Sequence, residues 1–163
     1  MYSLLFSKIK SDKKLIKNTL KRINLTKVDA LVVLHSHHDH VMDAAFVAEQ
    51  TKALILASKS SKNIIKKSTK ENLIILSNIN VFKIGDFTLR FIPSLHTKMN
   101  KKIEKILGIN KEVSKDFQTP AYFTAYKEGG TYSLLIEHKK GNVFISGSTN
   151  FKKDSLKNYQ ANT

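Results

Sequence analysis

Short hydrophobic runs alternate along this chain between strand-like and helix-like spacing. The run from Leu31 to Leu34 contains no polar residue, which predicts a strand buried on both faces. Val41 to Gln50 follows with apolar residues at helical spacing. Ser11 to Ile23 has the same spacing before the strand, with Ser11 and Asp12 as candidate N-caps, and this helix is expected to pack on the sheet. The expected order is helix, strand, polar loop, helix.

The remainder of the chain continues the alternation, which predicts a layered α/β fold. Further strands are expected at Ala53–Ala57 and Leu73–Leu76, and further helices at Ser60–Lys67 and Lys98–Leu107. Two hairpins are expected, one joining Val81–Ile84 to Phe87–Ile92 through Gly85-Asp86, the other joining Thr131–Glu137 to Asn142–Ser146. The irregular segment from Thr97 to Gly130 could wall off a site, but its aromatic residues are expected mainly to pack it against the body.

The polar loop after the buried strand carries a cluster of metal-ligand residues. His35, His37, Asp39 and His40 form the pattern His-x-His-x-Asp-His. Imidazole nitrogens and carboxylate oxygens are usual ligands of zinc and similar ions. In an extended loop His35 and His37 point to the same side, whereas Asp39 and His40 lie where the chain turns into the helix and could face a second ion. His38 and His138 are expected to lie away from the metal.

This pattern resembles the signature of the metallo-β-lactamase-fold hydrolases. The resemblance implies an αββα sandwich, with residues 1–163 forming one partial domain that is short at both ends. It also implies that His96, just after the strand at Phe87–Ile92, completes the first metal site. The family commonly carries Gly-Asp-Thr where this chain has Gly147-Ser148-Thr149, so Ser148 stands where a metal-bridging aspartate is expected. The segments around these residues look like a bacterial branch of the family.

The resemblance implies a metal-dependent hydrolase that uses a zinc-bound hydroxide on an ester or phosphodiester. Three neutral histidines leave a fourth zinc position open for water, whose pKa then falls to about 7. Asp39 is the expected catalytic residue, binding a second ion or orienting the water. A hydroxyl at Ser148 in place of a carboxylate is a weak ligand, so we expect one firmly held zinc and a weak second site. The expected substrate is a small or lipid-like molecule.

The composition restricts the partners. The formal net charge is +15, but of the 28 basic residues only Arg22 and Arg90 are arginine, the residue favoured for phosphate and base contacts. The lysines are spread along nearly the whole chain, so nucleic acid is not the favoured partner, and a metal-dependent nuclease is an alternative. No cysteine is present, and no apolar run is long enough to cross a membrane, so we expect a cytoplasmic protein. A second alternative is a truncated, inactive family member whose exposed sheet edges favour a homo-oligomer.

Overall fold

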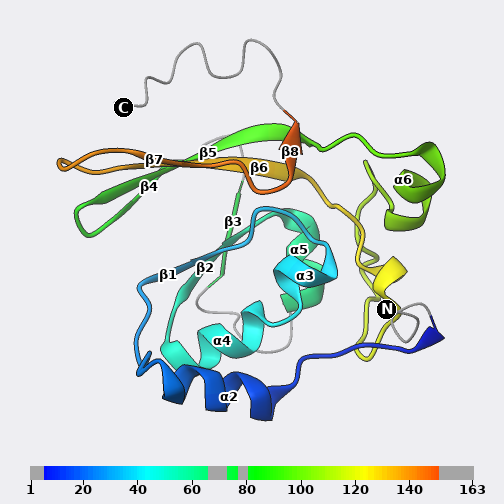
Figure 1. Ribbon diagram of the computed structural model, residues 1–163, viewed down its shortest axis with the longest axis horizontal. Helices are drawn as coiled ribbons and strands as arrows, with labels where there is room; N and C mark the ends of the chain where they lie inside the picture. Colours follow the sequence, from blue (N-terminus) through cyan, green and yellow to red (C-terminus); the bar gives the residue numbers. More distant parts are fainter. Residues whose placement is uncertain (1–5, 66–72, 77–80, 151–163) are drawn as a thin grey trace.

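Two β-sheets pack against each other in the computed structural model, which describes residues 6–65, 73–76 and 81–150 (Figure 1). The first sheet is parallel, in the order β1-β2-β3, and consists of β1 (Ala30–Val32), β2 (Leu54–Ala57) and β3 (Leu73–Ile75). The second is antiparallel, in the order β4-β5-β6-β7, and consists of β4 (Val81–Ile84), β5 (Phe87–His96), β6 (Thr131–Glu137) and β7 (Val143–Ile145). A short strand, β8 (Thr149–Asn150), pairs with the end of β5.

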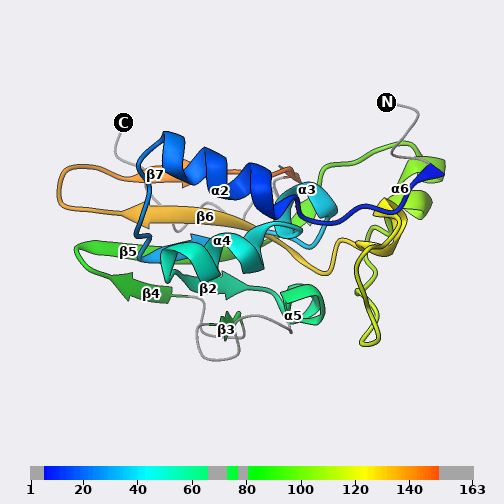
Figure 2. The same ribbon diagram turned by 90° about the horizontal axis from the view of Figure 1, so that it is seen from below.

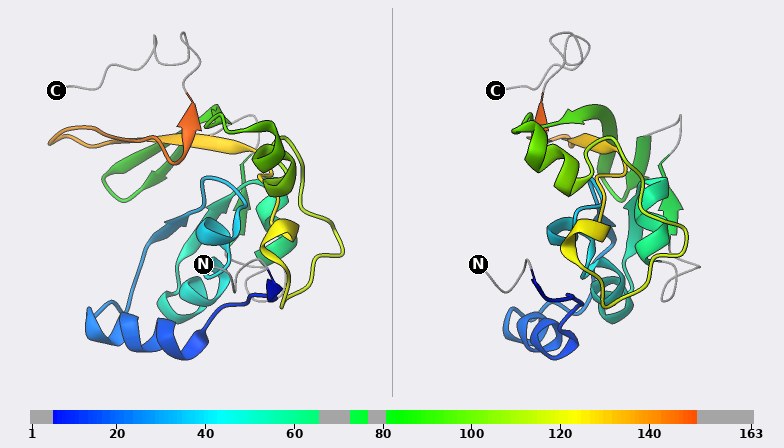
Figure 3. Two further views of the ribbon diagram at one scale, coloured as in Figure 1. Left: turned by 45° about the vertical axis from the view of Figure 1, so that its right-hand side comes forward. Right: turned by 90° about the vertical axis from the view of Figure 1, so that its right-hand side faces the viewer.

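Helices α3 (His38–Val41), α4 (Ala44–Thr51) and α5 (Lys59–Ile65) lie on the outer face of the parallel sheet, as Figure 2 shows from below. Helix α2 (Lys13–Arg22) packs on α4. The segment between β5 and β6 adds α6 (Lys101–Leu107) and a 3-10 turn, η2 (Phe123–Ala125), at one end of the two sheets (Figure 3). None of the helices in the described part of the chain has the length and apolar character needed to span a bilayer.

Two hydrophobic clusters hold these layers together. One lies between the sheets and joins Leu34 and Leu56 to Leu89, Phe91 and Leu134. The other lies between the parallel sheet and its helices, and its fully buried members include Val33, Val41 and Ile55. The described residues therefore form a helix layer and two sheet layers, which is an incomplete αββα metallo-β-lactamase-like sandwich, as expected from the sequence.

The expected strands and both hairpins are confirmed, with three differences in the elements next to the site. The helix expected from Val41 to Gln50 begins earlier, at His38, and is interrupted between α3 and α4. Strand β5 continues through Pro93 to His96, because its last residues pair with β8. Helix α2 contacts α4, which separates it from the sheet, and no residue of α2 is buried. Lys66 and Lys67, the end of the helix expected from Ser60, lie outside the described residues.

Candidate metal centre

The loop that follows β1 is anchored at Ser36. The Ser36 N–H donates to the carbonyl oxygen of Glu128 at 2.7 Å, and its hydroxyl lies 2.8 Å from the hydroxyl of Ser61. Because side chains alternate in an extended segment, the rings of His35 and His37 project away from these serine contacts. The main chain at His37 is extended, with φ −63° and ψ 154°, and α3 begins at the next residue. The loop is therefore fixed at its centre, between the two histidines.

His96 reaches the same place from the other sheet. It is the last residue of β5 and pairs with Thr149 of β8, which fixes the strand end. Its Nδ1 lies 3.0 Å from the carbonyl oxygen of Thr97. A carbonyl oxygen only accepts, so Nδ1 carries the hydrogen and the Nε2 lone pair is free. Strand β8 therefore fixes the end of β5, and Nε2 of His96 faces the loop after β1.

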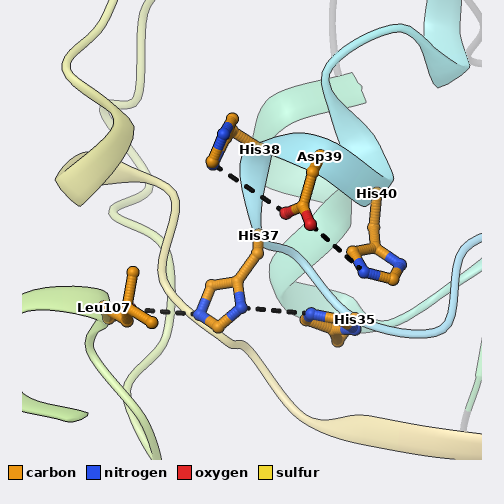
Figure 4. Close-up of polar contacts among 6 residues, drawn as sticks. All are labelled: His35, His37, His38, Asp39, His40 and Leu107. Atoms are coloured by element: carbon orange, nitrogen blue, oxygen red, sulfur yellow. Dashed lines mark hydrogen bonds and ion pairs between the residues drawn. The ribbon is translucent and has the colours of Figure 1, made fainter. Parts of the chain in front are cut away.

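The rings of His35, His37 and His96 form one buried cluster. Their ligand nitrogens all lie within 4.8 Å of one another. The exposed fractions of the three residues are 1%, 6% and 7%, so the cluster is closed to bulk water on most sides. His35 Nε2 and His37 Nδ1 are 3.1 Å apart (Figure 4). Within the described residues, this is the group of histidine and carboxylate side chains with the spacing of a metal site.

A main-chain carbonyl group fixes the ring of His37. Its Nε2 lies 3.2 Å from the carbonyl oxygen of Leu107, the last residue of α6 (Figure 4). Nε2 must donate in this contact, which leaves the Nδ1 lone pair directed towards His35. Histidines that bind metals generally donate their other ring N–H in this way. The contact therefore sets the tautomer that a metal ligand at Nδ1 needs.

Burial disfavours the charged form of three of the neighbouring rings, those of His35, His37 and His40. The pKa of His35 is lowered from 6.5 to about 2, chiefly by burial and then by the three neighbouring histidine rings. Burial also lowers the pKa of His37 and of His40. For His37 the ring of His96 adds to this effect, while the Leu107 carbonyl group and nearby carboxylates oppose it. A neutral imidazole has a lone pair for a metal, and a protonated one does not.

Asp39 and His40 lie beside the cluster on α3. The Asp39 side chain is 64% exposed, and its carboxylate oxygens lie 3.6 Å from His40 Nε2 and 3.9 Å from His38 Nδ1 (Figure 4). The ring of His40 packs against that of His35, with centroids 3.8 Å apart. These two predicted ligands are thus adjacent to the three-histidine group but are not members of it.

Ser148 lies on the turn before β8. It is exposed and has a left-handed backbone, with φ 63°. Its carbonyl oxygen accepts hydrogen bonds from both the N–H and the hydroxyl of Thr97, each at 2.9 Å. The main chain of Ser148 therefore braces the residue after His96. The two histidines expected away from the metal are outside the three-histidine group: His138 stacks on Phe87, and His38 lies near Phe123.

The three histidines offer a donor set that suits a metal ion, with all ligand nitrogens within 4.8 Å of one another and one pair at the spacing that zinc requires. Zn–N bonds of about 2.0–2.1 Å in a tetrahedron place neighbouring nitrogens about 3.3 Å apart, close to the 3.1 Å between His35 and His37. The Nδ1 of His35 is buried without a hydrogen-bond partner in the structure. An unpaired buried nitrogen costs about 1–3 kcal/mol, which a metal bond at Nε2 of the same ring would offset. All three ligands are nitrogens, which suit zinc and do not suit calcium or magnesium.

Two contributors to this site were not predicted from the sequence. Leu107 acts through its main chain, which has no side-chain pattern to detect. Glu128 binds Ser36 through its main-chain oxygen and buries its carboxylate close by. The available signal was Glu128 itself, an acidic residue directly before Gly129-Gly130 in a strongly basic chain.

Three solved structures share the fold with this chain. They are an isothiocyanate hydrolase from Delia radicum gut bacteria (19% identity, TM-score 0.55, 85% of this chain), a possible metal-dependent hydrolase from Veillonella parvula (19%, 0.55, 90%) and a metallo hydrolase from Ignicoccus hospitalis (15%, 0.50, 78%). The chain spans about half the length of each of them, at 48%, 49% and 45% of those chains.

A comparison with curated protein sequences gives no match. Family membership rests on a family model that covers nearly the whole chain. The model of the β-lactamase superfamily domain matches residues 10–162, a range that includes the histidine loop, His96 and the Gly-Ser-Thr turn. With the sandwich layers and the three-histidine site already in place, this match shows that the chain belongs to the β-lactamase superfamily and has its metallo-β-lactamase fold.

Proposed function

We propose that His35, His37 and His96 hold one zinc ion and that the chain carries the metal site of a hydrolase for esters or phosphodiesters. The observation that supports this most strongly is the convergence of three buried imidazoles from the loop after β1 and from the end of β5, which are strands of two different sheets. A bound zinc ion would lower the pKa of a water molecule to about 7 and would stabilise negative charge on the substrate oxygen.

The residues of this chain have separate tasks in that reaction. The carbonyl groups of Leu107 and Thr97 hold His37 and His96 in the tautomers that leave Nδ1 and Nε2 free, respectively. Asp39 is the proposed catalytic residue, because its carboxylate is exposed one turn beyond the cluster. In that position it can accept the proton of the attacking water or orient that water by a hydrogen bond. His40, next to Asp39, is the proposed second ligand of any further ion.

A second ion is expected to bind weakly. Asp39 and His40 offer one carboxylate and one imidazole, and Ser148 offers a neutral hydroxyl where the family has a carboxylate. A divalent ion next to another needs negative charge between the two, and this hydroxyl supplies none. We therefore propose one firmly held zinc, with His35, His37 and His96 as its ligands and Asp39, His40 and Ser148 around a weak site.

The proposed substrate is a small or lipid-like ester or phosphodiester. The proposed setting is a bacterial cytoplasm, and a homo-oligomer is compatible with the exposed side chains of Val143 and Ile145 on β7. The isothiocyanate hydrolase that shares the fold adds isothiocyanates to the substrates worth testing. No feature of the site specifically supports nuclease activity, so nucleic acid is one more substrate to test beside esters, phosphodiesters and isothiocyanates.

Metal content per chain is the decisive measurement. Wild-type protein and the variants His37→Ala and His138→Ala are loaded with zinc, dialysed, and analysed for zinc and protein. We expect one zinc per chain in the wild type and in His138→Ala, whose ring lies on the far hairpin against Phe87. His37→Ala should lose the ion. Absence of stoichiometric zinc from the wild type would contradict the proposal and favour an inactive chain that keeps part of the fold.

A further inference from the structure

Glu128 is a buried carboxylate outside the set of proposed metal ligands. Its exposed fraction is 4%, and it lies between the irregular segment and β6. Burying a carboxylate is strongly unfavourable unless its oxygens accept hydrogen bonds. Both oxygens do accept one: Oε2 from the N–H of Asn110 at 2.6 Å, and Oε1 from the hydroxyl of Thr131 at 2.7 Å. Each oxygen is thus committed to a donor of this chain.

The main chain of Glu128 makes two further contacts. Its carbonyl oxygen accepts the N–H of Ser36 at 2.7 Å, between the two histidines of the loop. Its N–H lies 3.4 Å from the carbonyl oxygen of Gly108, just after α6. One residue therefore joins three separate segments, which are the histidine loop, the turn after α6 and the start of β6.

The turn after α6 is the part that needs such support. Gly108 ends α6 in a left-handed conformation, with φ 67°, and Asn110 is also left-handed, with φ 59°. A left-handed backbone at a residue other than glycine is unfavourable and requires compensating contacts. The bond from the Asn110 N–H to the Glu128 carboxylate is such a contact. The carbonyl group of Leu107, which bonds to His37, lies directly before this turn.

These contacts form a continuous connection from Glu128 to His37. The carboxylate holds Asn110, the turn holds the Leu107 carbonyl group, and that carbonyl group holds the Nε2–H tautomer of His37. The main-chain bond from Ser36 fixes the loop on the other side of the same ring. Removal of the Glu128 side chain would leave the main-chain bond to Ser36 in place but would release Asn110, and with it the turn that holds the Leu107 carbonyl group against His37.

We propose that Glu128 is a positioning residue for the metal site, which fixes the tautomer and direction of His37 through the turn after α6. This proposal rests on the proposed function in one respect, because the Nε2–H tautomer of His37 has a role in the site only if Nδ1 binds a metal. The tautomer itself exists without a metal and is measured separately. Glu128 is not a ligand, since its two oxygens are engaged by Asn110 and Thr131.

The test compares Glu128→Ala, Glu128→Gln and Thr131→Val, with Glu112→Gln as the matched control. Gln can keep both contacts, with its oxygen accepting from Asn110 and its amide donating to the Thr131 hydroxyl. Thr131→Val preserves the side-chain shape and removes one donor to the carboxylate. Glu112 is an exposed acid on the same segment, so its replacement changes the charge equally and leaves the buried contacts intact.

Two quantities are measured. The first is the tautomer of His37 in the metal-free protein, from imidazole nitrogen shifts in ¹⁵N-labelled samples. The second is the zinc dissociation constant, from competition with a chelator. For Glu128→Ala we expect loss of the single Nε2–H tautomer and zinc affinity weaker by about 10- to 100-fold, the range for second-layer partners of metal histidines. Glu128→Gln should keep most of the single His37 tautomer and most of the zinc affinity. Thr131→Val should lie between Glu128→Ala and the wild type in both quantities, and Glu112→Gln should match the wild type.

The outcomes separate this proposal from the proposed function. A wild-type protein that binds no zinc but loses the His37 tautomer in Glu128→Ala contradicts the function and supports the positioning role. An unchanged tautomer and unchanged affinity in Glu128→Ala overturns the positioning role alone. If Glu128→Ala does not fold, the His37 tautomer is compared in Glu128→Gln, Thr131→Val and the control Glu112→Gln. A wild-type His37 tautomer in Thr131→Val would then overturn the positioning role of Glu128.

Discussion

His35 Nε2 and His37 Nδ1 lie 3.1 Å apart, with the two rings nearly perpendicular at 85°. In the absence of a metal one of these nitrogens donates to the other. Because Leu107 holds the hydrogen of His37 on Nε2, the donor is His35 and the acceptor is His37 Nδ1. To offer its Nε2 lone pair to a metal ion, His35 would carry its hydrogen on Nδ1 instead, which has no partner in the structure. The two facing nitrogens would then both have lone pairs, so binding would require a change of tautomer at His35.

Zinc should stabilise the folded chain, since unfolding separates ligands that come from both sheets. At a free zinc concentration one hundred times the dissociation constant, the expected gain in the free energy of unfolding is about 2.7 kcal/mol. His96→Ala should lose most of this gain, because it removes the ligand that the antiparallel sheet supplies. Thermal unfolding with and without zinc measures both effects. His138→Ala is the control, and an equal zinc shift in His96→Ala would contradict the assignment of His96.

As the pH falls, the free energy of unfolding of the metal-free protein should decrease more steeply than that of a variant without His35. The pKa of His35 falls from 6.5 to about 2 on folding, chiefly through burial. Below pH 6.5 the unfolded chain therefore binds a proton that the folded chain refuses, so stability falls as the pH falls. The expected gradient is about 1.4 kcal/mol per pH unit for one fully shifted histidine. The lowered pKa values of His37 and His40 add to it in the same direction.

Urea unfolding at several pH values between about 7 and 5 measures this gradient. His35→Gln should flatten it by roughly the contribution of one histidine. His138→Gln, outside the buried cluster, should keep the wild-type gradient. A steep gradient that survives in His35→Gln would show that other groups cause the acid sensitivity.

The sequence was sufficient to predict the parts of the site that depend on side-chain type and local pattern. The histidine loop follows a strand at the predicted place, although β1 is half-buried and the buried Val33 and Leu34 come after it, and His96 lies at the end of the strand identified from its apolar run. These features were accessible because a strand followed by ligand residues is a local signal. The prediction for α2 was less successful, since its apolar spacing suggested a buried face, yet Leu15 is 63% exposed.

The contacts that orient the ligands could not be predicted. Leu107 and His37 are separated by 70 positions, and the group that matters is a main-chain carbonyl, which every residue has. Glu128 is distinguished only by its burial, which depends on how the segment from Thr97 to Gly130 folds back over the loop. Tertiary contacts of this kind have no periodicity to detect.

Ser148→Asp should strengthen the second metal site. The resemblance to the family places a metal-bridging carboxylate at this position, and the left-handed backbone of Ser148 tolerates Asp better than most residues. We expect zinc content to rise from one towards two per chain when excess zinc is present. Ser148→Asn is the matched control, since it suits the same backbone without adding charge, and it should stay at one. Equal zinc content in the two variants would show that the carboxylate is not within reach of Asp39 and His40.

Gly129→Ala should destabilise the fold at the point where the histidine loop is anchored. Gly129 has φ 67°, and a Cβ atom there would collide with the side chain of Ser60 and lie 2.6 Å from the Ser36 hydroxyl oxygen. The left-handed backbone costs about 1–2 kcal/mol for alanine, and the collision adds about 1–3 kcal/mol. Gly85→Ala is the matched control, because Gly85 is also left-handed, with φ 57°, but a Cβ atom there meets open space. Urea unfolding should therefore show a larger decrease in the free energy of unfolding for Gly129→Ala than for Gly85→Ala. Equal decreases would mean that the side chains of Ser36 and Ser60 can move away from the new Cβ atom without loss of stability.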